Sequence, residues 1–285
     1  PVWHDDQQGT ATIAVAGLIN ALKIVNKKID RVKVTFIGTG AANVAVARLC
    51  FTAGVKPENS IMVDSKGILH KGRKDLESQR DWFADKWRLC TTTNSEGRTG
   101  GVPEAMRGAD VCIAMSASGP GVIKKEWVKA MAKDSIVFAC ANPVPEIWPW
   151  EAKEAGSRIV ATGRSDFPNQ VNNSMCFPGI FRGTLDVWAK TITDEMCIAA
   201  VNELATFAQE KGINDDYIVP TMEQWEVFPR VAAAVAMKAI EQGVARIKLS
   251  REAEVKQASD IIGRSRSMIA GMMSEGYILP PPPAP

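Results

Sequence analysis

The fold of this 285-residue chain is decided by the stretch Val34-Thr35-Phe36-Ile37-Gly38-Thr39-Gly40-Ala41-Ala42-Asn43-Val44-Ala45. A short run of strand-forming residues ends in two glycines spaced one apart, and an alanine-rich helical pattern follows. This order predicts a strand, a tight loop and a helix. Glycines let a backbone approach a diphosphate, and the N-terminus of a helix offers free N–H groups. The stretch therefore predicts a phosphate-binding loop lined by Gly38, Thr39, Gly40, Ala41, Ala42 and Asn43.

A second apolar run, residues 60–65, ends on a carboxylate that lies 26 positions after Gly38, since 64 − 38 = 26. An acid at the end of the second strand can accept hydrogen bonds from an adenosine ribose, so we expect Asp64 and the adjacent Ser65 to line that side of a dinucleotide site. Asn43 stands where the glycine pattern has its third glycine. Either the helix lies further from the strand, or the amide has a role of its own. The alternative to a dinucleotide site is an α/β crossover in which the two glycines only make a turn.

Composition excludes several classes of function. The chain is 46% hydrophobic and 23% charged, and 34 basic residues against 32 acidic ones leave a net charge of +2. We therefore expect no nucleic acid and no anionic membrane as partner. Six cysteines without a C-x-x-C pair indicate free, buried thiols in a reducing compartment rather than disulfides or zinc. No signal peptide and no apolar run of about 18 residues is present, so we expect a soluble, cytoplasmic protein.

Strand-like and helical patterns alternate from residue 31 to about 162, which predicts an α/β fold with a doubly wound, mostly parallel sheet of the Rossmann type. Helices are expected to flank it at both ends of the chain. The predicted division is a segment with acidic residues and a linking helix (1–30), a nucleotide-binding domain (31–190), C-terminal helices (191–274) and a proline-rich tail (275–285). Helices are predicted at 10–28, 75–86, 124–133, 193–211, 229–246 and 250–274. The last residues, Pro280 to Pro285, favour an extended or frayed tail.

Polar residues follow three further strand-like runs, at 107–115, 135–141 and 158–161. Ligands of parallel sheets bind at the carboxyl ends of the strands. We therefore expect Ser116 and Ala117 to lie where a cofactor passes, and Asn142 to lie at the same edge. Four amides follow the last of these strands: Asn169, Gln170, Asn172 and Asn173. They suit a carboxylate or a carboxamide, and the alternative is a surface turn.

The adjacent carboxylates Asp5 and Asp6 form the remaining candidate site. Two buried carboxylates repel each other unless a cation lies between them. Oxygen ligands of this kind suit Mg²⁺ or Mn²⁺. The alternative is an acidic cap on the helix that follows, where negative charge is also favourable.

Taken together, five motifs resemble those of malic enzymes, particularly the compact prokaryotic type. They are PVWHDDQQGTA, GTGAAN, VDSKG, FACANPVPEIWP and ATGRSDFPNQVNNSMCFPGIFRG, in this order, and the resemblance runs from residue 1 to at least about residue 240. The resemblance implies oxidation of L-malate at C2 by hydride transfer to NAD⁺ or NADP⁺, then loss of CO₂ to give pyruvate. A divalent metal is implied, which holds the keto oxygen during decarboxylation. The alternatives are another Rossmann dehydrogenase or a nucleotide-binding module without catalysis.

The resemblance also assigns roles to residues. Asp6 matches a metal-ligand carboxylate, and Asp5 matches the neighbouring acid that interacts with a lysine base. Asn142 matches an amide that binds substrate close to the nicotinamide. Asn172 and Asn173 match paired amides near the malate carboxylates and the nicotinamide ribose.

The same resemblance places Ser116 and Ala117 in a loop over the cofactor and Asp64 at the adenosine ribose. A 2′-phosphate is repelled by a carboxylate, so Asp64 favours NAD. The basic residues Lys66, Lys71 and Arg73 follow shortly and could compensate, so NADP stays an alternative.

The chain begins at Pro1 without an initiator methionine, and we expect it to be part of something longer. The resemblance implies that a tyrosine acid, a lysine base and two further metal-ligand acids lie upstream of Pro1. We therefore expect this polypeptide to bind nucleotide without efficient turnover of malate. Family resemblance also leads us to expect a homo-oligomer.

Overall fold

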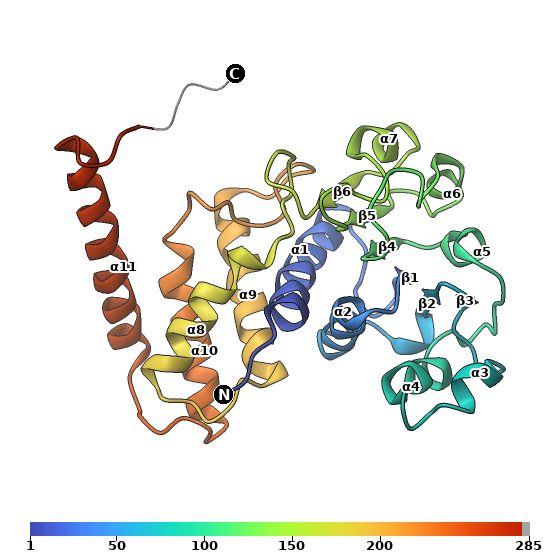
Figure 1. The fold of residues 1–285 in the computed structure, drawn as a ribbon, viewed down its shortest axis with the longest axis horizontal. Helices are drawn as coiled ribbons and strands as arrows, with labels where there is room; N and C mark the ends of the chain where they lie inside the picture. The colour runs from blue at the N-terminus through green and yellow to red at the C-terminus, as the bar shows by residue number, and fades with distance from the viewer. Residues whose placement is uncertain (281–285) are drawn as a thin grey trace.

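A six-stranded sheet forms the centre of one half of the molecule (Figure 1). This computed structural model describes residues 1–280. The strands are β1 (Val34–Ile37), β2 (Ser60–Asp64), β3 (Gly67–Ile68), β4 (Val111–Ala114), β5 (Ile136–Ala139) and β6 (Ile159–Thr162). They lie in the order β3-β2-β1-β4-β5-β6, and only β3 runs antiparallel to its neighbour. This is the strand order of the dinucleotide-binding fold, so the prediction of a Rossmann-type, mostly parallel sheet is confirmed. The short strand β3 was not predicted.

Both faces of the sheet are buried. Since successive side chains of a strand point to opposite faces, each parallel strand contributes to two core clusters. Val34, Phe36 and Ile113 belong to the larger core cluster, while their neighbours Ile37 and Cys112 belong to a second one. The larger cluster joins this face to α1 (Thr10–Ile24) and α2 (Ala41–Thr52). The second lies beneath α5 (Val102–Met106), α6 (Lys125–Lys129) and α7 (Pro149–Glu154). Layers on both faces explain why the strand sequences are almost entirely apolar.

The second half of the molecule is helical and packs on α1 (Figure 1). It consists of α8 (Phe177–Asp186), α9 (Asp194–Lys211), α10 (Val227–Glu241) and α11 (Arg251–Ser274). The predicted helices 193–211 and 250–274 match α9 and α11 within one residue. Each begins at a hydroxyl cap, since Thr193 accepts from the backbone N–H of Met196 and Ser250 from that of Ala253. The helix predicted at 229–246 lies at 227–241, and α8 was not predicted.

Two other predicted helices are wrong in extent. In place of one helix at 75–86, the chain forms α3 (Lys74–Glu77) and α4 (Ala84–Thr92). Residues 77–82 are exposed, so they have no apolar face that packing could stabilise as a helix. The helix predicted at 124–133 is limited to α6. Short turns complete the chain: η1 (Asp5–Gly9), η2 (Pro57–Asn59) and η3 (Asn173–Met175).

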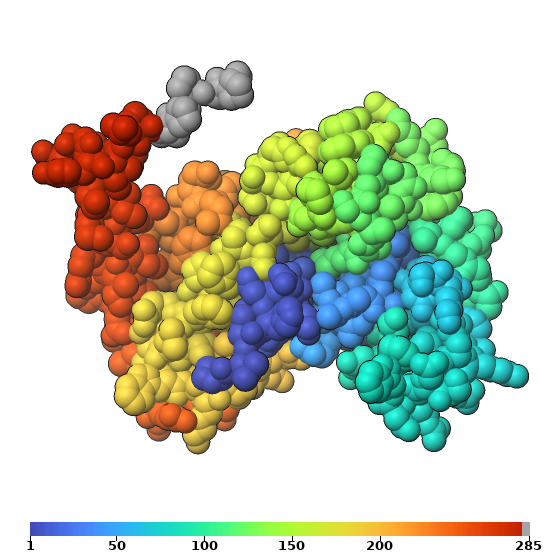
Figure 2. Space-filling model, in the orientation of Figure 1, coloured from blue at the N-terminus to red at the C-terminus, as the bar shows by residue number. Residues whose placement is uncertain are grey.

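The C-terminal helix α11 stands out from the body, as the red segment in Figures 1 and 2. Its first part packs on α10 and α8, and residues 264–277 are exposed. Within residues 1–280, no helix combines the length and the apolar character needed to cross a membrane. All six cysteines are free, and all but Cys140 are buried, as predicted. The end of the predicted proline-rich tail, residues 281–285, lies outside the described part of the chain.

Candidate active site at the carboxyl edge of the sheet

Four parallel strands end in one row. Ile37 of β1 pairs in register with Ala114 of β4, Ala114 with Ala139 of β5, and Ala139 with Thr162 of β6. On the other side, Ile37 pairs with Val63, which precedes Asp64. Every segment that leaves the sheet here therefore begins at the same edge. The candidate residues after β1, β2, β4, β5 and β6 share that edge because the strands are parallel and nearly equal in length.

The glycine loop starts at Gly38, which has a φ of +95°. Its N–H donates to the carbonyl of Val63 at 2.9 Å, and an added Cβ would lie 2.5 Å from the carbonyl oxygen of Met115. Both the dihedral angle and the close approach require glycine. Gly40 differs, because its backbone is extended (φ −74°, ψ 173°) and a Cβ there would meet no atom within 4 Å. It precedes α2 and is exposed, so the open space in front of it lies at the N-terminus of a helix, where an anion is favoured.

Asn43, at the third glycine position, is fully buried. Its Nδ2 donates to the carbonyls of Ile37 (3.0 Å) and Gly38 (2.9 Å), with a longer contact to Ile113 (3.3 Å). The amide therefore fastens the first turn of α2 to the ends of β1 and β4. The Asn43 side chain therefore has a role of its own, which is to fix the glycine loop.

A cleft of about 390 Å³ opens beside the glycine loop. Its lining comes from three parts of the chain: Gln7 next to the acidic pair, Thr39 to Arg48 of the loop and α2, and residues 82–86 at the start of α4. Its size lies within the usual range for small-molecule sites. The N-terminal acidic segment and the predicted phosphate loop thus border the same cleft.

At the end of β2, Asp64 is held by an arginine. The Arg73 guanidinium donates to both oxygens of Asp64 at 3.0 Å, and the backbone N–H of Lys66 adds a third bond at 2.9 Å. Arg73 also forms an ion pair with Asp75 at 2.8 Å. The hydrogen bonds to Asp75 and to Asp64 raise the pKa of the guanidinium. Both side chains of the Asp64–Arg73 pair are only 9% exposed. Ser65 is exposed beside them. The negative charge of Asp64 is therefore offset by Arg73. From the sequence alone, this compensation was only one possibility.

Beyond β4, Ser116 and Ala117 are exposed at the same edge. The backbone N–H of Ser116 donates to Glu146 Oε1 at 2.8 Å, and the backbone N–H of Ala141, after β5, donates to Glu146 Oε2 at 3.0 Å. Glu146 is completely buried and was not predicted as a site residue. The one signal in the sequence is an acid enclosed by Pro145 and Ile147 in an otherwise apolar run.

Two of the predicted amides meet across a glycine. Asn142 follows β5 and is joined to Pro143 by a cis peptide bond, and its Nδ2 lies 3.2 Å from where a Cβ on Gly163 would be. Asn172 donates from Nδ2 to the carbonyl of Gly163 at 3.1 Å, and its Oδ1 accepts from the N–H of Ser174 at 3.0 Å. The structure therefore brings Asn142 and Asn172 together beside Gly163, which follows β6. A Cβ at position 163 would crowd Asn142 and the carbonyl oxygen of Cys140, which lies 3.3 Å from that position.

Asn173 reaches the other candidate cluster. Its Nδ2 donates to Asp5 Oδ2 at 2.6 Å, and Trp3 Nε1 donates to Asp5 Oδ1 at 3.1 Å. Burial, with a smaller contribution from the charge of Asp6, raises the pKa of Asp5 although the two donors act in the opposite direction. Asp6 is exposed. The hydrogen bond between Asp5 and Asn173 brings the N-terminal acidic pair next to the paired amides, although these two residues are 168 positions apart in the chain.

The described residues provide only part of a ligand set for a divalent metal. Asp5 and Asp6 supply carboxylate oxygens, which suit Mg²⁺ or Mn²⁺. Within residues 1–280, no group of three or more histidine, cysteine, aspartate or glutamate side chains is close enough to hold an ion. The described residues fit the role of contributing one or two ligands to a metal, and they do not form a complete site.

The remaining amides of the predicted loop have structural roles. Asn169 is buried, where its Nδ2 donates to the carbonyls of Val160 and Asp215 and its Oδ1 accepts from the N–H of Ile218. Gln170 forms an isolated parallel β-bridge with Thr162, the last residue of β6. The bonds of Asn169 reach 46 and 49 positions along the chain, so this residue has a structural role and does not belong to a surface turn.

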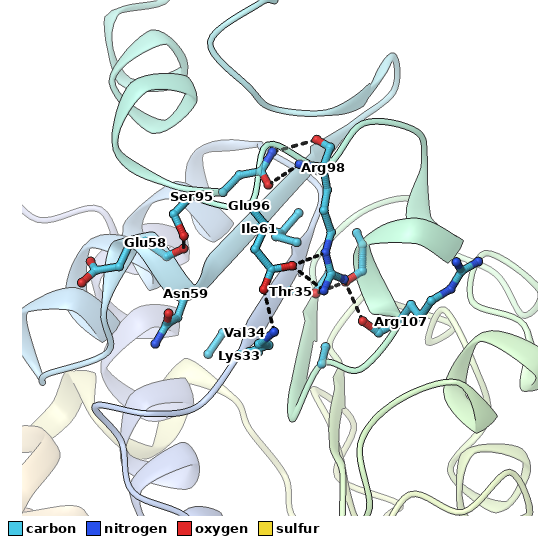
Figure 3. A pocket seen from close by; sticks show the side chains of 13 residues that line it. Lys33, Val34, Thr35, Glu58, Asn59, Ile61, Ser95, Glu96, Arg98 and Arg107 are labelled. Carbon is cyan, nitrogen blue, oxygen red and sulfur yellow. Dashed lines mark hydrogen bonds and ion pairs between the residues drawn. The ribbon is translucent and has the colours of Figure 1, made fainter.

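A further pocket lies at the opposite end of the sheet, next to the residues that begin β1 and β2 (Figure 3). Three of its charged side chains, Lys33, Glu96 and Arg98, are paired with one another. Glu96 accepts from Lys33 at 2.6 Å and from Arg98 at 2.7 Å, and Arg98 also donates to the carbonyl of Arg107 at 2.7 Å. These pairs join the loop 94–98 to the amino ends of the strands. Their position and mutual satisfaction indicate a structural role, away from the carboxyl edge.

Comparison with known proteins agrees with this arrangement. The family described as malic enzyme, NAD binding domain, matches residues 7–240. A bifunctional malic/malolactic enzyme of Bacillus subtilis is 46% identical over 265 residues, which are 92% of this chain and 62% of the relative. An NAD-dependent malic enzyme of Geobacillus stearothermophilus is 46% identical, covering 86% of this chain and 49% of the relative. An NADP-dependent malic enzyme of Halomonas elongata is 40% identical over 278 residues.

Solved structures give the same result. The malic enzyme of Entamoeba histolytica has a TM-score of 0.96 and 51% identity, and it covers 99% of this chain. The malic enzyme of Pyrococcus horikoshii has a TM-score of 0.90 and 46% identity. The chain spans 58% and 63% of these two proteins, respectively. The matched range and the shared fold establish that this chain belongs to the malic enzyme family and contains its NAD-binding domain.

Proposed function

We propose that the chain is the dinucleotide-binding part of an NAD- or NADP-dependent malic enzyme, which converts L-malate to pyruvate and CO₂. The observation that carries this proposal is the common edge of the sheet. There, the glycine loop with its open space at Gly40 lies in one row with the amides Asn142 and Asn172. A dinucleotide binds across the point where the strand order reverses, which in this sheet lies between β1 and β4.

In this proposal the backbone of residues 38–43 binds the diphosphate, and the amides orient the reacting groups. An amide has two N–H donors and two acceptor lone pairs. Asn172 uses one of each within the protein, so one donor and one acceptor remain for a carboxamide or a carboxylate. A bound nicotinamide supplies the hydride acceptor, and the protein supplies its orientation.

For the metal, we propose that Asp6 contributes a ligand to Mg²⁺ or Mn²⁺. When bound, such an ion acts as a Lewis acid toward the keto oxygen. Asn173 and Trp3 donate to Asp5 and fix its orientation next to Asp6. The role of Asp5 toward a lysine base rests on the family resemblance alone.

NAD is the cofactor we propose, with NADP as the alternative. Asp64 lies at the end of β2, where a carboxylate accepts from ribose hydroxyls and disfavours a 2′-phosphate. Arg73 offsets this charge, which reduces the discrimination. The relatives carry names of both kinds, NAD-dependent and NADP-dependent. The position of Asp64 at the end of β2 supports the choice of NAD.

Calorimetric titration of residues 1–285 with NAD, NADP and ADP-ribose tests the proposal. We expect saturable binding of NAD and of ADP-ribose, and weaker binding of NADP. Absence of binding by all three nucleotides would contradict the proposed function. A clear preference for NADP would contradict only the argument from Asp64.

Turnover is measured separately, as pyruvate formation from L-malate with Mn²⁺ and each nucleotide. We propose that residues 1–285 bind nucleotide without efficient turnover, and that a polypeptide extended upstream is active. Efficient metal-dependent turnover by residues 1–285 would refute this. We also propose a homo-oligomer in the cytoplasm, which light scattering of the purified protein and cell fractionation test.

A further inference from the structure

Glu146 is a buried carboxylate without a cationic partner in its hydrogen-bond shell. Its side chain is 0% exposed, and its partners are the backbone N–H groups of Ser116 (2.8 Å) and Ala141 (3.0 Å) and the hydroxyl of Ser116 (3.3 Å). Burial raises the pKa of this carboxyl, while the backbone donors oppose the rise. A buried acid costs free energy unless it is well bonded, so its retention here calls for a structural reason.

The two groups that it holds belong to different crossover segments. Ser116 begins the segment after β4, and Ala141 immediately precedes Asn142 in the segment after β5. A second set of bonds joins the same segments further out, since Gly119 donates to the carbonyl of Val144 at 3.2 Å and Ser118 Oγ donates to the same carbonyl at 3.1 Å. Glu146 is the innermost tie and the one directly next to Asn142.

These two segments border one half of the proposed cofactor site. The other half is formed by the glycine loop after β1 and by Asp64 after β2, which Asn43 and Arg73 fasten independently. No hydrogen bond of the Glu146 side chain reaches that half directly. Its carboxylate thus fixes the β4–β5 side of the site and leaves the β1–β2 side to other bonds.

We propose that Glu146 is a positioning residue for the nicotinamide half of the bound dinucleotide, acting through Asn142 and the backbone of Ser116. This inference rests on the proposed function. Loss of the tie is expected to weaken recognition of the nicotinamide nucleotide while the ADP-ribose half is still bound normally. A residue needed only for folding would affect both halves alike.

The test compares NADH with ADP-ribose in the Glu146→Gln variant of the full chain. Glutamine has nearly the same volume, but its amide group offers a donor where the carboxylate accepts, so one of the two segments is released. We expect Kd for ADP-ribose within about twofold of the unchanged protein, and Kd for NADH raised at least about tenfold, which corresponds to about 1.4 kcal/mol. The fluorescence of bound NADH, which reports the surroundings of the nicotinamide, is expected to move toward that of the free nucleotide.

Glu154→Gln is the matched control, because Glu154 is an exposed acid on α7 paired with Lys125. We expect it to leave both constants unchanged. If Glu146→Gln does not fold, Glu146→Asp is measured with the same expectation, since its shorter side chain reaches only one segment. Equal weakening of both ligands, or no change in either, would overturn the inference. Failure of the unchanged protein to bind either ligand would overturn the proposed function and this inference with it.

Discussion

The two glycines of the loop respond to substitution in opposite ways, and their contrast tests the diphosphate site. In Gly40→Ala the added methyl group enters open space, with a φ of −74° that any residue adopts. Alanine is a poorer helix cap than glycine by a few tenths of a kcal/mol, and it reduces the entropy of the unfolded chain by a similar amount. We therefore expect a change in the free energy of unfolding below about 1 kcal/mol, or about 2–4 °C in Tm.

The same methyl group would occupy the space where the diphosphate approaches the backbone. We expect Kd for ADP-ribose to rise at least about tenfold in Gly40→Ala. Gly38→Ala has the opposite profile, because its φ is +95° and its Cβ would lie 2.5 Å from a carbonyl oxygen. Backbone strain costs about 1–3 kcal/mol and overpacking a similar amount, so we expect a loss of roughly 2–5 kcal/mol in stability.

Thermal unfolding and calorimetry of the two variants give the measurement. Gly263→Ala on α11 is the control, since a Cβ there also meets open space and lies in a helix far from the site. It is expected to gain up to about 1 kcal/mol in stability and to bind ADP-ribose normally. Unchanged binding by a folded Gly40→Ala would refute the placement of the diphosphate.

Three further predictions concern side chains that the sequence did not fully explain. Asn43→Ala is expected to lower the free energy of unfolding, measured by chemical denaturation, by about 1–3 kcal/mol, because the carbonyls of Ile37 and Gly38 lose a buried donor. Asn43→Asp is expected to cost more. Equal stability of the two variants and the unchanged protein would contradict the role of the amide. Arg73→Gln leaves Asp64 with an uncompensated charge. The ratio of Kd for NADP to Kd for NAD is therefore expected to rise at least about tenfold. An unchanged ratio would show that Arg73 has no part in the choice between NAD and NADP. Burial and, to a smaller extent, the charge of Asp186 raise the pKa of Glu254 from 4.5 to about 7. The contribution of the protonated Glu254 to stability is therefore complete below pH 4.5 and is lost as the pH rises through about 7. The Tm of Glu254→Gln minus that of the unchanged protein is expected to be larger at pH 8 than at pH 5, and a constant difference would contradict the assignment.

Much of the fold could be predicted because the strands are short, apolar and followed at once by polar or glycine residues. Parallel strands of similar length then place residues such as Ser116 and Asn142 at one edge without further information. The two-residue strand β3 and the break between α3 and α4 could not be predicted, because neither has a periodic pattern of its own. Helix α8 follows the amide loop without a separate boundary signal, since Asn172 caps the short turn η3 in between.

The sequence predicts which residues lie at the carboxyl edge of the sheet, but it does not predict the bonds among them. Asn43 and Arg73 were recognised as departures or complications, yet only coordinates reveal which carbonyls and carboxylates they contact. Glu146 was missed because burial of an acid is a tertiary property that depends on two other segments. The link between Asp5 and Asn173 also joins distant parts of the chain, and no local pattern encodes it.

The central claim is that residues 38–43 bind the diphosphate of a dinucleotide whose nicotinamide lies beside Asn142 and Asn172. A crystal structure of the protein soaked with NAD tests it most directly. We predict that the phosphates lie against the backbone of Gly40 and that the nicotinamide ring lies next to Gly163, between the two amides. Nucleotide bound at any other face, or with its nicotinamide directed away from these amides, would contradict the account.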